Sequence, residues 1–166
     1  MFEAIGEFLV SLPHEIYLII ISMIPFVELR GAIPVGIGFG MNPVEVFILC
    51  VIANCIPVPF IIFLIKPIFR WLKRFRAFEK IITKLEGLAD KKSGKITAYK
   101  YEMVGLMLFV GIPLPGTGAW SGALIAALLN MRIKHAFFAI VLGVILAGVL
   151  VTLISSGALA ALKFLI

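Results

Sequence analysis

Charge-free apolar runs dominate this sequence, and their lengths limit what the chain can fold into. Val46 to Ile65 is a run of twenty uncharged residues, and Ala136 to Leu162 is a run of twenty-seven. A helix of about 20 apolar residues crosses the roughly 30 Å hydrocarbon core of a bilayer. Only 14% of the 166 residues are charged, whereas soluble domains average about 25%. The sequence therefore predicts an all-α integral membrane protein.

Two further apolar runs are interrupted by prolines and glycines, and their pieces are too short to cross a membrane. The first follows Ile16 and is broken between Pro25 and Pro34, with the irregular part expected over Glu28–Pro34. The second, Met103–Met131, is broken at Pro113–Gly118. Irregular backbone at membrane depth is tolerated only where it packs in protein or lines a cavity. We therefore predict two re-entrant helical hairpins.

The flanking charges predict how these segments are oriented. Eleven of the 15 Lys and Arg residues lie between Lys66 and Lys100, which the positive-inside rule places in the cytoplasm. Glutamates without Lys or Arg flank the first broken run, whereas basic residues flank the second. The first hairpin is thus expected to enter from outside and the second from the cytoplasm. Each is followed by one full span, so the two halves form an inverted repeat, a plan typical of secondary transporters.

The predicted organisation is a single membrane domain over residues 1–166, in the cell (inner) membrane. Residues 1–65 form the first repeat with an N-terminal interfacial helix, residues 66–101 a basic cytoplasmic connection, and residues 102–166 the second, inverted repeat. The connection is expected to hold an amphipathic helix on an anionic membrane surface. Both termini are predicted outside, and Ser155-Ser156-Gly157 is expected to mark the end of the last span.

Glu28 and Arg30 are the first candidate site residues, because ionisable groups inside a membrane are costly and usually functional. The carboxylate of Glu28 would bind a cation or couple transport to a proton or sodium ion. The guanidinium of Arg30 would bind a phosphate or carboxylate, for which its planar donor fork is suited. The structural alternative is an ion pair that only holds the loop tip.

The second break supplies further candidates without charge. Its glycines can expose backbone amides, and the half-helix that follows would point its positive end at the hairpin tip. Asn54, in the middle of the first full span, is expected to make an interhelical hydrogen bond more readily than a substrate contact. The remaining candidates are the prolines, glycines and polar side chains of the two breaks: Pro34, Pro113, Pro115, Gly116, Thr117, Gly118, Trp120 and Ser121.

Several classes of function are not indicated by the sequence. Motifs of metalloproteases, P-loop enzymes and serine hydrolases are missing, so no catalytic residue is assigned and the protein is not expected to be an enzyme. Cys50 and Cys55 have neither metal-ligand spacing nor a disulfide framework. No metal or cofactor is expected. No nucleic-acid partner is expected either, because the positive-inside rule accounts for the basic cluster.

The two breaks carry a family resemblance. Glu28-Leu29-Arg30-Gly31-Ala32-Ile33-Pro34 and the stretch from Pro113 to Ala123 resemble the signature sequences of the small multidrug export protein family. This resemblance covers nearly the whole chain, implies drug export, and carries Glu28 and Arg30 over as site residues. A more distant resemblance to the DedA superfamily implies two facing re-entrant hairpins. It also implies transport of lipid-linked carriers such as undecaprenyl phosphate, or scrambling of phospholipids.

The function predicted from these features is a small inner-membrane transporter with a midplane site between two re-entrant loops. We expect it to be ion-coupled and to move an amphipathic or lipid-linked substrate, as a DedA-like lipid flippase would. The alternatives are an exporter of small hydrophobic cations and a structural membrane protein with an architectural ion pair. Expected partners are membrane lipids, the small-molecule substrate and a coupling proton or sodium ion. Small chains often dimerise, so a homodimer is compatible with the sequence.

Overall fold

The structure is a computed structural model that describes residues 12–72, 96–114, 116–129 and 131–165. Within these ranges the chain forms helices and their connections, and no strand is present. The predicted all-helical class is therefore confirmed. The expected N-terminal interfacial helix, most of the amphipathic connection and the candidate Pro115 lie outside the described residues.

The first hairpin consists of two short helices, α2 (His14–Met23) and α3 (Glu28–Gly38), joined by residues 24–27. Helix α2 ends before Pro25, because a proline pushes the preceding residue toward extended conformations, and Ile24 has φ −73° and ψ 128°. Leu18 of α2 and Ala32 of α3 have no exposed surface. The two helices therefore pack as one unit.

The first break lies earlier in the chain than the sequence analysis predicted. Glu28–Pro34 is not irregular but forms the first turns of α3, and Pro34 lies inside the helix with its side chain exposed. The prediction was wrong because it weighed the prolines above the helical spacing of the apolar residues. Leu29, Ile33 and Ile37 are at most 4% exposed, and burying that stripe offsets the single backbone hydrogen bond that Pro34 removes.

The second hairpin consists of α7 (Ile96–Gly111) and α8 (Ala119–Leu128). Its connection, residues 112–118, lies where the sequence predicts the break. Gly116 has a φ of +82°, a left-handed conformation that glycine adopts without a steric penalty. The two helices approach closely, because a Cβ atom at Gly122 of α8 would lie only 2.5 Å from a methyl group of Val110 in α7.

Helices α4 (Pro43–Cys55) and α5 (Pro57–Leu72) follow the first hairpin and are separated only at Ile56. The Asn42 side chain caps α4 by accepting a hydrogen bond of 2.9 Å from the backbone N–H of Val44. Ile56 keeps helical dihedral angles, with φ −57° and ψ −49°. The interruption falls where Pro57 has no backbone N–H to donate to the helix.

Helix α9 (Ile133–Leu165) follows the second hairpin. It continues through Ser155-Ser156-Gly157, so the end that the sequence analysis expected there is wrong. Serine and glycine weaken a helix interior by about 1 kcal/mol or less each, too little to end a long helix. Two stretches, Pro43–Leu64 and Ile133–Ala158, are long and apolar enough to cross a membrane.

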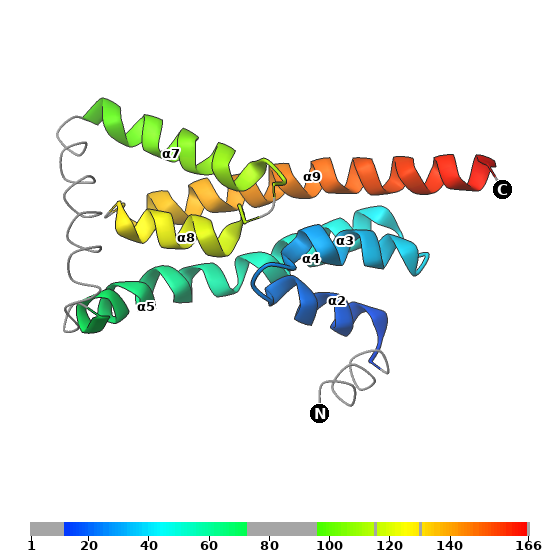
Figure 1. Cartoon of the computed structure of the whole chain (residues 1–166), viewed down its shortest axis with the longest axis horizontal. Helices are drawn as coiled ribbons and strands as arrows, with labels where there is room; N and C mark the ends of the chain where they lie inside the picture. Colours follow the sequence, from blue (N-terminus) through cyan, green and yellow to red (C-terminus); the bar gives the residue numbers. More distant parts are fainter. Residues whose placement is uncertain (1–11, 73–95, 115, 130, 166) are drawn as a thin grey trace.

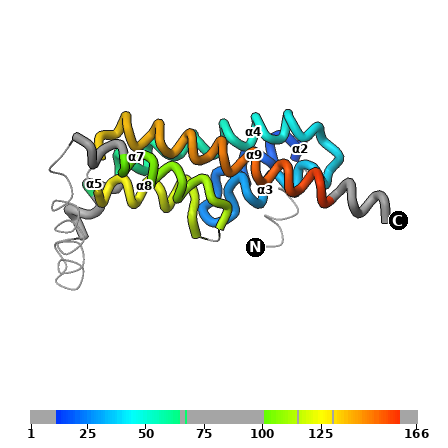
Figure 2. The backbone as a smooth tube through the Cα atoms, turned by 90° about the horizontal axis from the view of Figure 1, so that it is seen from above, coloured from blue at the N-terminus to red at the C-terminus, as the bar shows by residue number. Residues whose placement is uncertain are grey.

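The two hairpins approach each other from opposite ends of an elongated molecule, and their tips lie near its middle (Figures 1 and 2). The long helices run beside both hairpins in opposite directions (Figure 1). Each hairpin also packs on the long helix of the other half, since α3 contacts α9 and α8 contacts α5. The two tips are therefore held together by the long helices as well as by their own contacts.

Corresponding backbone hydrogen bonds recur in the two halves. Three bonds around the α3–α4 connection have counterparts exactly 90 residues later around the α8–α9 connection. They run from Phe39 to Val35, Met41 to Gly36 and Val46 to Asn42, and from Leu129 to Ile125, Met131 to Ala126 and Ala136 to Arg132. The offset equals the one that aligns Met41 with Met131 in the sequence.

Candidate functional site

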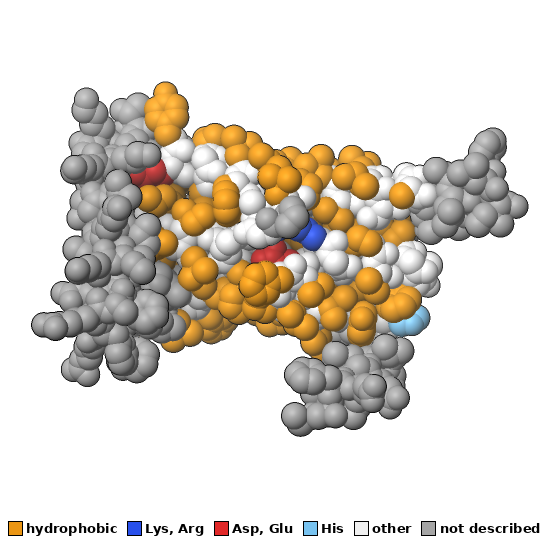
Figure 3. All heavy atoms as spheres, in the orientation of Figure 1, with side chains coloured by type: hydrophobic (Ala, Val, Ile, Leu, Met, Phe, Trp, Pro, Cys, Tyr) orange, Lys and Arg blue, Asp and Glu red, His pale blue; other side chains and the backbone are white. Residues whose placement is uncertain are grey.

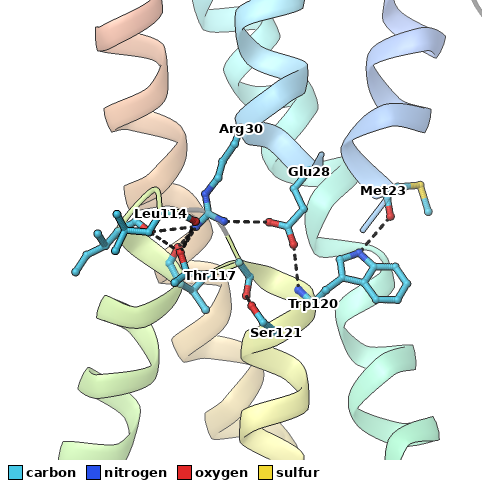
Figure 4. Close-up of polar contacts among 10 residues, drawn as sticks. Met23, Glu28, Arg30, Leu114, Thr117, Trp120 and Ser121 are labelled. Atoms are coloured by element: carbon cyan, nitrogen blue, oxygen red, sulfur yellow. Dashed lines mark hydrogen bonds and ion pairs between the residues drawn. The ribbon is translucent and has the colours of Figure 1, made fainter. Parts of the chain in front are cut away.

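The first turns of α3 and α8 meet where the hairpin tips come together, with the end of α7 beside them (Figure 4). Glu28 and Arg30 project from α3, whereas Thr117, Trp120 and Ser121 come from the second hairpin. The structure thus brings the two predicted breaks into one site.

Glu28 is held at the N-terminus of a helix in the other hairpin. Its carboxylate is buried, with the residue 5% exposed, and Oε1 accepts a 3.2 Å hydrogen bond from the backbone N–H of Trp120. The first N–H groups of a helix lack partners within the helix and carry a partial positive charge. Glu28 therefore caps α8 from outside that helix.

The backbone of Glu28 is strained. Its φ of +50° lies in the left-handed region, which costs a residue with a side chain about 1–3 kcal/mol and persists only where the surroundings enforce it. Phe26, two residues earlier, has a φ of +74° and is 95% exposed. The tight turn before α3 places the Glu28 carboxylate against α8.

Arg30 makes the matching contact with the end of α7. Its Nη2 donates to the carbonyl oxygens of Val110 at 3.0 Å and Ile112 at 3.2 Å, and to Oγ1 of Thr117 at 3.1 Å. Carbonyl groups at a helix C-terminus carry a partial negative charge that favours cations. The Nη1–Oε2 distance between Arg30 and Glu28 is longer, 3.7 Å. The second hairpin is thus a closer partner for Arg30 than Glu28 is.

Trp120 makes the reverse contact, from the second hairpin to the first. Its indole Nε1–H donates to the carbonyl oxygen of Met23, the last residue of α2, at 3.2 Å (Figure 4). In each hairpin, the incoming helix therefore has its C-terminus capped by a side chain from the other hairpin. Arg30 caps α7, and Trp120 caps α2.

The connection of the second hairpin is shaped to receive these groups. The hydroxyl of Thr117 lies 2.8 Å from the carbonyl oxygen of Ile112 and 2.9 Å from that of Leu114, so its proton is directed at that pair and its oxygen is free to accept from Arg30. Gly118 allows the approach of Glu28, because a Cβ atom there would overlap the carboxylate oxygens. Ser121 donates back to the carbonyl of Gly118 at 3.3 Å.

A cavity of about 260 Å³ opens beside these contacts. Its polar lining comes from Glu28, Arg30, Thr117, Trp120 and Ser121, and its apolar lining includes Phe26 and Leu124, with Pro25 and Gly116 completing the wall. Figure 3 shows acidic and basic side chains reaching the surface near the middle of an otherwise mostly hydrophobic or uncharged face.

A larger hollow of about 530 Å³ lies between α7 and α8. Apart from Glu102 and Tyr101 its lining is apolar: Gly105, Leu106, Phe109, Ile125 and Leu129. It shares no lining residue with the Glu28–Arg30 cavity. The smaller cavity is the better candidate, because polar groups from two distant segments converge on it.

Four predicted residues in the described part of the chain lie outside the lining of this cavity: Pro34, Pro113, Gly118 and Asn54. Gly118 borders a neighbouring narrow space beside Glu28 instead. Pro34 is exposed on α3, and Pro113 lies in the second connection without lining the cavity. Asn54 is 1% exposed and borders the same neighbouring narrow space together with Glu28 and Arg30. The interhelical hydrogen bond expected for Asn54 is missing, since neither its Oδ1 nor its Nδ2 has a partner.

Sequence reasoning missed the parts of the site that are backbone. The carbonyl groups of Met23, Val110 and Ile112 have no signature in the sequence, and Phe26 and Leu124 look like ordinary lipid-facing residues. The N-terminus of α8 was predicted to face the hairpin tip. That the Glu28 carboxylate would bind there was not predicted. Among the described residues, no cluster of His, Cys, Asp and Glu could hold a metal ion.

Fold and site together define a small helical membrane protein in which two hairpins cap each other's helix ends. The chain belongs to the family described as "Putative small multi-drug export protein", which matches residues 28–150. The match begins at the first residue of α3 and includes both motifs, Glu28–Pro34 and the stretch from Pro113 to Ala123, as well as Asn54, which confirms the resemblance read from the two motifs. No curated protein and no solved structure matches the chain. The relation to the DedA superfamily stays a prediction.

Proposed function

We propose that this protein is an ion-coupled transporter whose substrate binds in the cavity between the hairpin tips. One observation carries the proposal: a buried carboxylate and a guanidinium from one hairpin meet the helix ends of the other beside a cavity of about 260 Å³. The description of the family as an export protein supports a transport role. Glu28 is the coupling or cation-binding group, and Arg30 binds an anionic group or balances Glu28.

The proposed substrate is amphipathic or lipid-linked. Sites for whole small molecules are about 300–1,000 Å³, so a cavity of about 260 Å³ suits a polar head group better than a complete amphiphile. Phe26 and Leu124 contribute exposed apolar surface to its lining. The tail of the substrate would remain in lipid beside these residues while the head group contacts the polar wall.

The proposed membrane arrangement is a pair of inverted repeats, each with a re-entrant hairpin and a spanning helix. The opposite directions of the hairpins (Figure 1) and the hydrogen bonds that recur after 90 residues support this arrangement. The basic segment over residues 66–101 would lie in the cytoplasm, and both termini outside. The two hairpin tips would then meet near the midplane, where secondary transporters bind their substrates.

Transport is tested in proteoliposomes with an imposed pH difference, using NBD-labelled phosphatidylglycerol and dithionite quenching to follow its movement between leaflets. We expect Glu28→Gln to abolish the pH-driven movement while the helical circular dichroism stays unchanged. Glu45→Gln, at an exposed carboxylate in the first turn of α4, is the matched control and should transport like the natural protein. Undiminished movement in Glu28→Gln would remove the role assigned to Glu28.

Orientation is tested by single cysteines at positions 42 and 133, in a background where Cys50 and Cys55 are replaced by alanine. A membrane-impermeant maleimide should label position 42 from outside and position 133 only from the cytoplasmic side. Labelling of both positions from the same side would overturn the inverted repeat.

Export of small hydrophobic cations is the second candidate, supported by the family description and by the aromatic side chains of Phe26 and Trp120 beside Glu28. Aromatic faces attract cations. In the same proteoliposomes, Glu28-dependent movement of tetraphenylphosphonium without movement of the labelled lipid would favour this candidate.

A purely structural role is the third candidate, supported by the way Glu28 and Arg30 cap the opposite hairpin. It predicts that Glu28→Gln and Arg30→Gln lower the melting temperature in detergent while neither probe is moved by the natural protein.

A further inference from the structure

Asn54 has a buried polar side chain that makes no hydrogen bond. It lies near the end of α4, is 1% exposed, and has no partner for either Oδ1 or Nδ2. A buried polar group without a partner destabilises the folded state, because its hydrogen bonds to water are lost and not replaced. We therefore expect the Asn54 amide to find a hydrogen-bond partner in another arrangement of the surrounding side chains.

The surroundings narrow the choice of partner. Asn54 borders a narrow space that has no room for a water molecule, so a partner from the protein itself is required. Most of the lining is apolar or backbone: Leu29, Val110, Gly118, Ala119, Val144 and Ala147. The polar side chains on that lining besides Asn54 are Glu28 and Arg30.

The chemistry of the amide matches a protonated carboxyl group. An ionised carboxylate only accepts hydrogen bonds. Glu28 accepts one from the N–H of Trp120 and also forms an ion pair with Arg30. A protonated carboxyl has one O–H donor and one carbonyl acceptor, and a primary amide offers the complementary acceptor and donor. Arg30 has hydrogen-bond donors only. It could donate to the Asn54 oxygen but could not accept a hydrogen bond from the Asn54 NH₂ group, so it cannot replace the carboxyl group as the partner.

We propose that Asn54 is the partner of protonated Glu28. Ionised Glu28 stays at the N-terminus of α8, and proton uptake turns it toward Asn54, where the acid and the amide form two hydrogen bonds. The proton enters from the aqueous phase through the cavity that Glu28 also lines. The move frees the Trp120 N–H and one side of Arg30 for a substrate group that accepts hydrogen bonds. This last link to transport rests on the proposed function.

Among the described residues, Arg30 is the other titratable group that lines this space. The other titratable residues of the surrounding helices lie at other positions along those helices. Those with described side chains on α2 are His14, Glu15 and Tyr17 in its first turns; those on α4 are Glu45, Cys50 and Cys55; those on α7 are Tyr101 and Glu102; those on α9 are Lys134 and His135 at its start. None of these lines the space, so a pH-dependent change there is assigned to Glu28.

The test is infrared difference spectroscopy of the purified full chain in nanodiscs, with no substrate present. When the pH is lowered, the natural protein should show the carbonyl band of a hydrogen-bonded carboxylic acid. The Glu28→Gln variant should not show this band. In Asn54→Leu that band should shift to the higher frequency of an acid without such a bond. Ser22→Ala is the matched control, because Ser22 is also a buried polar residue but does not line this space. Its band should stay in place.

A second measurement covers the case in which Asn54→Leu does not fold. With ¹³C in the asparagine side-chain carbonyls, the natural protein should show a shifted amide band as the pH falls, and Glu28→Gln should show none. An unmoved acid band in Asn54→Leu, an unmoved amide band, or no acid band at all would each overturn the proposal. Because these signals need no transport, a protein that moves neither probe but shows both shifts would disprove the proposed function alone.

Discussion

The two hairpins have the same architecture but contribute opposite chemistry to the site. The first, α2–α3, brings both charged side chains, Glu28 and Arg30. The second, α7–α8, brings no charged side chain to the cavity and instead supplies the ends of two helices, with Thr117 and Trp120. The two hairpins are thus complementary parts of one site.

This difference teaches how charges can be kept between apolar helices. Burying an ion pair by itself gains little, because desolvation offsets the attraction between the charges. Here each charge also meets the oppositely polarised end of a helix, and Arg30 lies nearer to the end of α7 than to Glu28. The second hairpin therefore stabilises the charges of the first, and neither hairpin is complete alone.

The largest effect is expected from Arg30→Gln, which removes the cation of the first hairpin. It leaves the buried Glu28 without its counter-charge and the carbonyl groups at the end of α7 without their donor. We expect a loss of about 3 kcal/mol in the free energy of unfolding, measured by denaturant titration in mixed micelles. Lys134→Gln, an exposed cation on α9, should lose less than about 0.5 kcal/mol. Equal losses would show that Arg30 is not held as described.

A smaller effect is expected from Gly118→Ala, which disturbs the fit between the hairpins. The φ of 168° at Gly118 suits any residue, so the obstacle is the overlap of the new methyl group with the Glu28 carboxylate. We expect Gly118→Ala to lower the free energy of unfolding by about 1–3 kcal/mol in the same titration. In a Glu28→Asp background, where the acid is shorter, the same substitution should cost less. Gly38→Ala, which has open space around it, should cause no loss. Additive losses in the Gly118–Glu28 pair would contradict the close approach.

The smallest effect is expected from Trp120→Phe, which keeps the aromatic body of the side chain but removes the indole N–H. The carbonyl of Met23 then loses its donor from the second hairpin. We expect a loss of about 1 kcal/mol in the free energy of unfolding, measured in the same titration. An unchanged value would show that the capping between the hairpins runs in one direction only.

Much of the architecture was predictable from local properties of the sequence. The lengths of the apolar runs predicted two long helices and two pairs of short ones, because helix length and hydrophobic thickness are linked by the rise per residue. The break at residues 112–118 was predicted from proline and glycine alone. Predictions failed where packing decided the outcome, as at Pro34 inside α3 and at Ser155–Gly157 inside α9.

The sequence by itself determined the helical class and the family, and it singled out Glu28 and Arg30 as charged residues within an apolar region. Only the tertiary structure decided what these charges meet, because their partners are backbone groups whose identity is independent of the side chain. The carbonyls of Val110 and Met23 become ligands only once two hairpins from distant parts of the chain are brought tip to tip. Likewise, Asn54 is a common polar residue in sequence and becomes an unpaired amide beside Glu28 only in the packed structure.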